Sequence, residues 1–217
     1  MARSKSSGAW LARHVSDPYV RKAGAHGYRA RSAFKLIEIV NSEGLARPGD
    51  TVVDLGAAPG SWSQVLAKRV GDLGKVVAVD LLDVAPIPGV TFIRGDFRED
   101  EVLKRLEAAL GERKVDLVVS DMAPNISGVR ASDQARSIQL CELALDFARN
   151  HLNPRGAIVV KAFQGSGYPE FLGEMRRAFV TVASKKPGAS RGESREMYLW
   201  GKGLRMAGGG REGKEGS

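Results

Sequence analysis

Residues 51–62 read TVVDLGAAPGSW, an apolar run that ends in an aspartate and is followed by a turn with two glycines. The run is short and rich in β-branched residues, as strands buried on both faces are. Gly56 and Gly60 allow the backbone to turn sharply and to approach a ligand closely. This stretch therefore predicts a buried strand that leads into a ligand-binding turn at the carboxyl edge of a sheet.

Runs of the same kind recur along the chain and alternate with amphipathic stretches. We predict parallel strands at 51–56, 75–80, 90–96, 115–121 and 157–163, and helices at 61–70, 99–110, 133–151 and 168–178. Two further strands, near 180–185 and 195–201, follow one another without a full helix between them, which predicts a closing hairpin with one antiparallel strand. The succession indicates an α/β fold with a seven-stranded, mostly parallel sheet and helices on both faces.

The length of 217 residues suits one compact domain. We divide the chain into a basic N-terminal extension (1–30), a folded domain that carries the site (31–203) and a glycine-rich tail (204–217). The tail has too little apolar surface to fold, so we expect it to be disordered. A helix at about 30–43 is expected outside the sheet, as a cover on the substrate side.

The net charge of +8 and the sequence pI of about 9.8 favour a polyanionic partner. Within residues 1–35 the only acidic side chain is Asp17, against eight basic ones: Arg3, Lys5, Arg13, Arg21, Lys22, Arg29, Arg31 and Lys35. Tyr19, Tyr28 and Phe34 interleave with these charges, and the mixture suits phosphate contacts with base or ribose packing. Residues 184–205 add six basic side chains against two acidic ones, so we expect RNA contacts on both flanks of the site.

The single cysteine, Cys141, rules out a disulfide framework and a cysteine-based metal site, and it fits a reducing compartment. No apolar run approaches the roughly 18 residues that span a membrane, and the first ten residues lack the apolar core of a signal peptide. We therefore expect a cytoplasmic protein without a membrane partner or a bound metal.

Acidic residues stand at the ends of the predicted strands around the glycine turn. The interrupted pattern Ala58-Pro59 is unlike a dinucleotide fingerprint, which opposes a nicotinamide-dependent enzyme. The carboxylate of Asp80 can accept hydrogen bonds from both ribose hydroxyls of an adenosine, and that of Asp96 can accept a hydrogen bond from the adenine amino group. Together these positions indicate an S-adenosylmethionine pocket of the class I methyltransferase fold, which is Rossmann-like. The indole of Trp62 could be core or a wall of that pocket.

The turn after the fourth strand reads SDMAPN (120–125) and lacks the aromatic residue with which enzymes acting on exocyclic amines grip a base. Carbon methylation would need a cysteine nucleophile near this turn, but Cys141 lies about twenty residues on, within a helix. A hydroxyl acceptor remains, and it needs a base or an orienting group. Lys161 follows the apolar run AIVV, although a lysine at a strand end is by itself usually a solvated charge.

The motifs SDPYVRKA, YRARSAFKLIEI, VVDLGAAPGSWSQVL, SDMAPNISG, VVKAFQG and KPGASRGESREMYLW resemble the FtsJ/RrmJ (RlmE) family of ribosomal RNA 2'-O-methyltransferases. The resemblance implies that 31–203 is a methyltransferase domain that binds S-adenosylmethionine. It also implies four catalytic residues, Lys35, Asp121, Lys161 and Glu196, and five cofactor contacts, Gly60, Trp62, Asp80, Asp96 and Asp121. Ser61 departs from the second glycine that many members carry. We expect it to cap the following helix and to change cofactor affinity slightly.

The role of Lys161 stays open at this point. A lysine with an ordinary pKa of about 10.4 is a poor base at neutral pH. A nearby ammonium from Lys35 would favour a neutral amine, whereas the carboxylates of Asp121 and Glu196 would favour the charged form. Our hypothesis is a general base. The alternative is an ammonium that orients the oxygen and leaves the proton to water.

The resemblance further implies that the substrate is a uridine 2'-hydroxyl in the A-loop of 23S rRNA within the large (50S) subunit, and we expect a monomer. The alternatives are a tRNA 2'-O-methyltransferase of the same family and a non-catalytic rRNA-binding assembly factor. Replacing Arg21, Lys22, Arg29 and Arg31 together is expected to weaken RNA binding and to leave cofactor binding intact.

Overall fold

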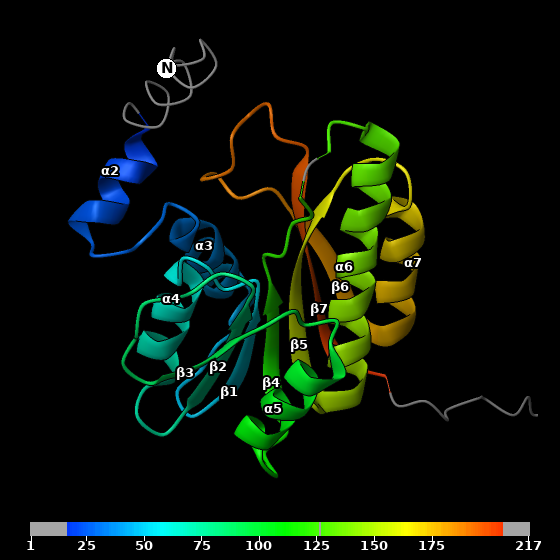
Figure 1. Cartoon of the computed structure of the whole chain (residues 1–217). Coiled ribbons are helices and arrows are strands. Elements are labelled where there is room, and N and C mark those ends of the chain that lie inside the picture. Colours follow the sequence, from blue (N-terminus) through cyan, green and yellow to red (C-terminus); the bar gives the residue numbers. More distant parts are fainter. Residues whose placement is uncertain (1–16, 126, 206–217) are drawn as a thin grey trace, which may run out of the picture.

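The computed structural model describes residues 17–125 and 127–205 (Figure 1). The first half of the predicted basic extension and most of the glycine-rich tail lie outside these residues. Seven strands form one sheet: β1 (Thr51–Leu55), β2 (Lys75–Asp80), β3 (Val90–Arg94), β4 (Val115–Ser120), β5 (Leu152–Phe163), β6 (Phe179–Lys185) and β7 (Glu196–Leu204).

The strand order is β3-β2-β1-β4-β5-β7-β6. The first five strands are parallel, and β7 runs antiparallel to both of its neighbours, β5 and β6. The predicted mostly parallel seven-stranded sheet with one reversed strand is confirmed. The reversed strand, β7, lies inside the sheet between β5 and β6. The loop after β6 leads the chain back to pair with β5, so β6 forms the edge of the sheet.

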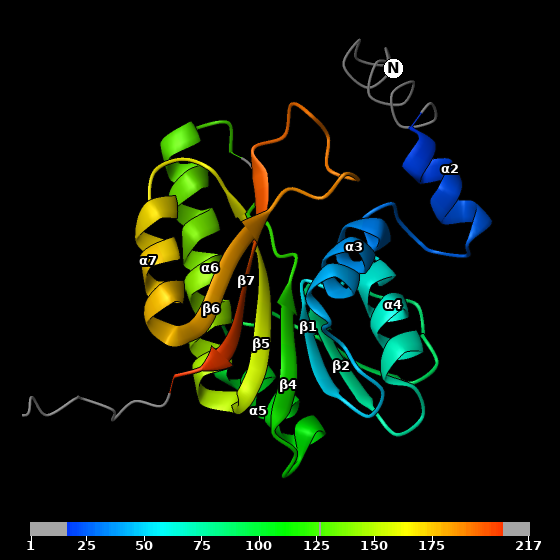
Figure 2. The same ribbon diagram turned by 180° about the vertical axis from the view of Figure 1, so that it is seen from behind.

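Helices cover both faces of this sheet (Figures 1 and 2). On one face lie α3 (Ala33–Glu43) and α4 (Ser61–Val70); on the other lie α5 (Asp100–Leu110), α6 (Arg130–His151) and α7 (Tyr168–Ala178). Each layer has its own apolar core against the sheet. A short helix, α2 (Pro18–Ala25), stands beside α3 at the carboxyl edge of the parallel strands.

The helix predicted at 30–43 is α3, and it does more than cover the substrate side. Leu36, Ile39 and Val40 are fully buried and pack against β1, β4 and β5 through Val52, Val119 and Val159. Burial of this apolar stripe makes α3 part of the core layer. The predicted domain of 31–203 therefore starts just before a helix that belongs to its core.

Several element boundaries differ from the prediction, among them the starts of β5 and α6. Strand β5 begins at Leu152, five residues before the predicted start, because α6 ends at His151 and the chain enters the sheet directly. A shift in register follows Val115 where this extra segment pairs with β4. Helix α6 begins at Arg130, three residues early. Both differences fall in polar segments, where hydrophobic periodicity carries little information.

The order of the strands reverses between β1 and β4, which are neighbours with connections leading to opposite sides. Ligands of open α/β sheets bind outside the carboxyl ends of the strands at such a point. The turns after the two strands touch here: a side chain at Gly56, which has φ +78°, would place its Cβ 2.8 Å from the backbone nitrogen of Met122. Only glycine suits both the positive φ and the close approach.

Within the described ranges, no helix combines the length and the apolar character needed to cross a membrane.

Candidate active site

Two lysine–carboxylate pairs form the centre of the site. Lys161, near the end of β5, places its Nζ 2.6 Å from the carbonyl oxygen of Asp121 and 3.1 Å from its Oδ1. Lys35, in the first turn of α3, places its Nζ 2.5 Å from Oε1 of Glu196 at the start of β7. The structure thus brings together the four side chains expected to be catalytic, although Lys35 and Glu196 are 161 residues apart in the sequence.

Tyr198 lies between the two pairs. Its hydroxyl donates to Oδ1 of Asp121 at 3.0 Å, and Nζ of Lys35 stands 5.7 Å from the centre of its ring. On the sheet Tyr198 is the direct partner of Lys161, and Glu196 follows on the same face two residues away. Tyr198 therefore contacts a member of each pair.

Sequence reasoning missed Tyr198. The alternation in Glu196-Met197-Tyr198 does indicate which side chains share a face of a strand. The register that sets Tyr198 opposite Lys161 could not be read from it, because it depends on how β7 pairs within the sheet.

The charges of the site perturb two of these groups. Burial raises the pKa of Glu196, but the charges and hydrogen bonds around it, first of all those of Lys35, outweigh burial, so its pKa lies below the ordinary value. Glu196 is therefore a carboxylate at neutral pH. Burial first, and then the carboxylates of Asp121 and Glu196, raise the pKa of Tyr198 well above its ordinary value, so its phenol stays protonated and donates.

The turn after β1 is tied to the end of β2 by Asp80. Its two carboxylate oxygens accept from the backbone nitrogens of Ala58 and Leu82, each at 2.8 Å. Because these bonds occupy one direction at each oxygen, lone pairs remain that can accept ligand hydroxyls. Asp80 therefore positions the glycine turn and can also contact a ribose.

Asp96 lies two residues beyond the end of β3, at the same edge of the sheet. Arg98 grips its carboxylate with Nε and Nη2, at distances of 2.5 to 3.1 Å. These side-chain hydrogen bonds hold the pKa of Asp96 below its usual value. The pairing of this carboxylate, which we expect to meet an adenine amino group, with the neighbouring Arg98 could not be predicted from the sequence.

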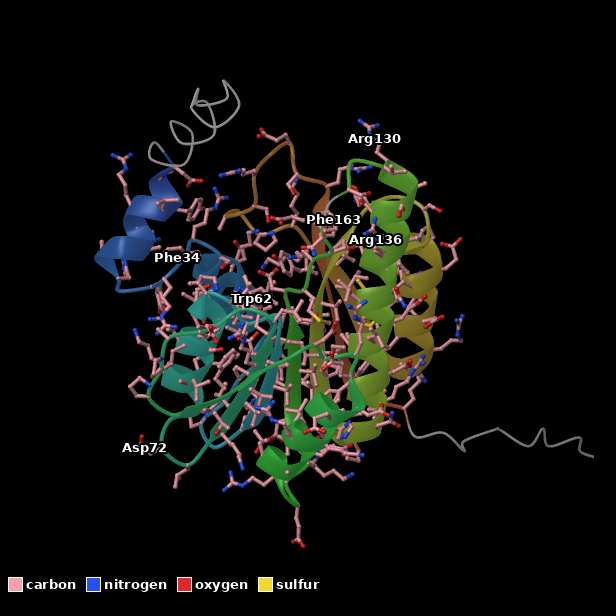
Figure 3. The ribbon with its side chains drawn as sticks, in the orientation of Figure 1. Phe34, Trp62, Asp72, Arg130, Arg136 and Phe163 are labelled. Atoms are coloured by element: carbon pink, nitrogen blue, oxygen red, sulfur yellow. The ribbon has the colours of Figure 1, made fainter. Side chains whose placement is uncertain are left out.

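The indole of Trp62 is core. It is 2% exposed, its ring packs against Tyr198 with 5.7 Å between centroids, and its Nε1 donates to the carbonyl of Ser32. Figure 3 shows it directed from α4 into the interior. Of the two interpretations left open by the sequence, the structure favours the core for this ring.

The expectation that Ser61 caps α4 is wrong. Gly60 is the N-cap, and Ser61 is the first helical residue. Its hydroxyl lies 2.7 Å from that of Ser32, the N-cap of α3, which makes no capping bond of its own. The two hydroxyls instead join the beginnings of the two helices that carry the glycine turn and Lys35.

Asp54, in β1, is a buried carboxyl group that the sequence did not single out. It is fully buried; Oδ2 accepts from Oγ of Ser63 at 2.6 Å, and Oδ1 has no partner. Burial raises the pKa of Asp54 to about 7; the hydrogen bond from Ser63 opposes this rise, and the carboxylates of Asp121 and Asp80 add to it.

Four carboxyl groups, those of Asp54, Asp80, Asp96 and Asp121, thus gather at this edge of the sheet. Such a set suits a ligand with hydroxyl and amino donors and a positive charge, and it repels a pyrophosphate. S-adenosylmethionine has these features, so the residues fit it. Among the described residues no cluster of histidine, cysteine and acidic side chains could hold a metal ion.

Basic side chains surround the carboxyl edge of the sheet, on α2, on the loop between β6 and β7, and at the start of α6, where Figure 3 labels Arg130 and Arg136. Two of the arginines expected to contact RNA have partners within the protein. Arg31 pairs with Asp17 and donates to the carbonyl of Ala189. Arg29 donates to the carbonyls of two loops, as described below. In contrast, the side chain of Arg21 is exposed and has no hydrogen bond or ion pair with the residues described.

The family model, the similar sequences and a solved structure agree on the kind of protein that this chain resembles. The model of the family described as FtsJ-like methyltransferase matches residues 28–204. A protein of Chromobacterium violaceum named ribosomal RNA large subunit methyltransferase E is 58% identical over 94% of this chain and 100% of its own length. A protein of the same name from Dechloromonas aromatica is 57% identical with the same coverage. A crystal structure of a ribosomal RNA methyltransferase from Plasmodium falciparum superposes with a TM-score of 0.73 and 31% identity, over 82% of this chain and 98% of that one.

The raised pKa of Asp54 predicts a pH dependence of stability. A carboxyl group whose pKa is higher in the folded than in the unfolded state costs stability as pH rises between the two values. Relative to Asp54→Asn, the wild type should therefore lose up to about 4 kcal/mol of unfolding free energy between pH 4 and pH 7. Urea unfolding at several pH values measures this difference. The exposed Asp72→Asn serves as control and should show no such trend. A difference between wild type and Asp54→Asn that is constant over this range would contradict the assignment.

Proposed function

The chain belongs to the FtsJ-like methyltransferase family, and on this premise we propose that it methylates a ribose 2'-hydroxyl. The proposed methyl donor is S-adenosylmethionine, and the proposed substrate is a uridine in the A-loop of 23S rRNA within the large ribosomal subunit. The observation that carries the proposal is the position of Lys161, held by Asp121 at the carboxyl edge of the sheet and two strands away from the glycine turn.

The cofactor, when bound, supplies an electrophilic methyl group on a sulfonium. The residues suited to hold its adenosine are Asp80 and Asp96, with the turn at 56–60 against its backbone. Asp121 joins the cofactor side of the site to Lys161. Its carbonyl and carboxylate contact Lys161, and its backbone nitrogen donates to the carbonyl of Leu55 in β1. The acceptor hydroxyl is therefore expected beside Lys161, on the side of Asp121.

We favour the orienting role of Lys161 over that of a general base. Its Nζ donates a hydrogen bond to the carbonyl oxygen of Asp121 and forms an ion pair with the carboxylate of the same residue. An ammonium group, which has three donors, suits both contacts. A remaining N–H of the ammonium group would donate to the ribose oxygen and leave the other lone pair of that oxygen free to face the methyl group. Lys35 and Glu196 flank this position as a neutralised pair, and Tyr198 keeps Asp121 from rotating.

The choice of ribosomal RNA rests on two observations. The relatives from Chromobacterium violaceum and Dechloromonas aromatica, which align over nearly the whole chain, carry the name ribosomal RNA large subunit methyltransferase E. Basic side chains border the site on several elements, as binding to an RNA backbone requires. We further propose that the protein acts as a monomer in the cytoplasm. The intact set of four catalytic side chains argues against a non-catalytic assembly factor.

The role of Lys161 predicts a large loss of activity in Lys161→Met, about 100-fold to 10,000-fold, because the variant removes the orienting group but keeps an apolar stem of similar size. Single-turnover transfer of a labelled methyl group to large ribosomal subunits measures it. Binding of S-adenosylhomocysteine should be unchanged within twofold, which controls for folding. A variant with wild-type transfer rate would contradict the assignment.

The same assay distinguishes the two roles of Lys161. An orienting ammonium predicts a single-turnover rate that stays flat from pH 7 to pH 9. A general base with an ordinary lysine pKa predicts a rate that rises nearly tenfold per pH unit. Offering free tRNA in place of large subunits tests the alternative substrate, and we expect no transfer to it.

The RNA surface predicts that Arg21→Ala combined with Arg195→Ala weakens RNA binding. Both side chains are exposed at the carboxyl edge, and losing two phosphate contacts should flatten the plot of log affinity against log salt by roughly 1.5. Filter binding of a labelled 23S rRNA fragment between 50 and 200 mM salt measures the slope. The matched control is Arg113→Ala with Lys114→Ala, two exposed charges just before β4 at the opposite edge. Equal slopes for the two double variants would refute the assignment.

A further inference from the structure

Arg29 joins the glycine turn to the neighbouring loop after β2. Its Nη1 donates to the carbonyl of Pro59, in the turn after β1, and its Nη2 donates to the carbonyl of Pro86, in the loop after β2; both distances are 3.0 Å. The planar fork of a guanidinium can reach two such acceptors at once. Arg29 therefore links the ends of two neighbouring strands at the edge where a cofactor is expected.

The backbone of the same segment is held by α4. The nitrogen of Arg29 donates to Oε1 of Gln64 at 2.9 Å, and Nε2 of Gln64 donates to the carbonyl of Gly27 at 3.0 Å. Lys68, one turn further along α4, has its Nζ 4.8 Å from the centre of the Tyr28 ring. The position of Arg29 is thus fixed at its backbone as well as at its tip.

Gly60 shows how closely Arg29 approaches the turn. A Cβ on Gly60 would lie 2.7 Å from Nη1 of Arg29, 2.8 Å from Cδ1 of Ile87 and 2.9 Å from Cγ1 of Val84. The guanidinium and the loop after β2 therefore pack directly on the backbone of this glycine. Gly60 has φ +103°, a conformation that few other residues tolerate, and the contact braces it from outside.

We propose that Arg29 is a positioning residue for cofactor binding: it clamps the turn at 56–60 to the loop at 81–89 and so sets the shape of the adenosine pocket. The proposal rests on the proposed function in that both loops border the S-adenosylmethionine site. It assigns Arg29 to the cofactor, whereas the sequence placed it among the RNA-binding residues with cofactor binding left intact.

The clamp also follows from what the two loops lack. Pro59 and Pro86 have no backbone N–H, so neither can hydrogen-bond to the other loop as a donor. The carboxylate of Asp80 ties Ala58 and Leu82 at the inner ends of these loops, and Arg29 ties their outer ends. Among the described residues, the other polar contacts of this loop lie near its beginning, at Leu81 to Asp83, and near its end, at Ile87, so the bond from Arg29 to Pro86 adds a link between them.

The experiment compares Arg29→Gln and Arg29→Lys with the matched control Arg21→Gln, in the full chain. Calorimetry gives the Kd for S-adenosylhomocysteine without RNA, and methyl transfer to large subunits gives KM for the cofactor and kcat. We expect Arg29→Gln to raise the Kd and the cofactor KM about tenfold while kcat at saturating cofactor stays within twofold. Arg29→Lys should recover part of the loss, because an ammonium can reach one of the two carbonyls. Arg21→Gln should leave the Kd unchanged and weaken RNA binding.

An unchanged cofactor Kd in both Arg29 variants would overturn the proposal, and so would a loss confined to RNA affinity. A fall in kcat without a change in KM would also overturn it, because it would point to general damage or to a role in the reaction. If the wild type itself did not bind S-adenosylhomocysteine, the proposed function would fail. If the wild type binds S-adenosylhomocysteine and both Arg29 variants bind it equally well, only the role of Arg29 is refuted.

Discussion

The contact between Asp121 and Lys161 is the interaction on which the site depends. Asp121 follows β4, Lys161 ends the apolar part of β5, and Tyr198 from β7 donates to the same carboxylate. β4 and β5 are parallel neighbours, and β7 lies next to β5 because it inserts between β5 and β6 and runs antiparallel to both. The reversed strand thus has a chemical consequence, since it carries Tyr198 and Glu196 to the face where Lys161 and Asp121 meet.

The N-terminal segment joins the two halves of the site. Helix α3 brings Lys35 to Glu196 and buries its apolar stripe on β1 and β4, while Arg29 just before it holds the loops of the cofactor side. Ser32 adds a third link through the hydroxyl of Ser61 and the indole of Trp62. A segment that looks like a basic RNA-binding extension in the sequence is therefore partly built into the pocket. This explains why it should influence the cofactor and the RNA through different arginines.

The sequence predicted the sheet well because its strands are short apolar runs bounded by glycine and aspartate, a pattern typical of buried parallel strands. It also predicted the carboxyl edge as the site, since Asp80 and Asp121 stand at strand ends. It could not predict which charged groups are paired within the protein. Arg31 pairs with Asp17, Arg98 pairs with Asp96, and Arg29 donates hydrogen bonds to two carbonyls. These pairings depend on distances across the fold. The roles of Tyr198 and Asp54 were hidden for the same reason, because strand register and full burial decide them.

The reaction proposed for these four side chains is the methylation of one ribose of large-subunit RNA. Mapping of 2'-O-methylated nucleotides in cells with the gene, without it, and with the gene for Lys161→Met tests it most directly. We expect that one uridine methylation in the 23S rRNA A-loop disappears when the gene is removed, returns with the wild-type gene and stays absent with Lys161→Met. An unchanged rRNA map, or a loss confined to tRNA, would contradict it.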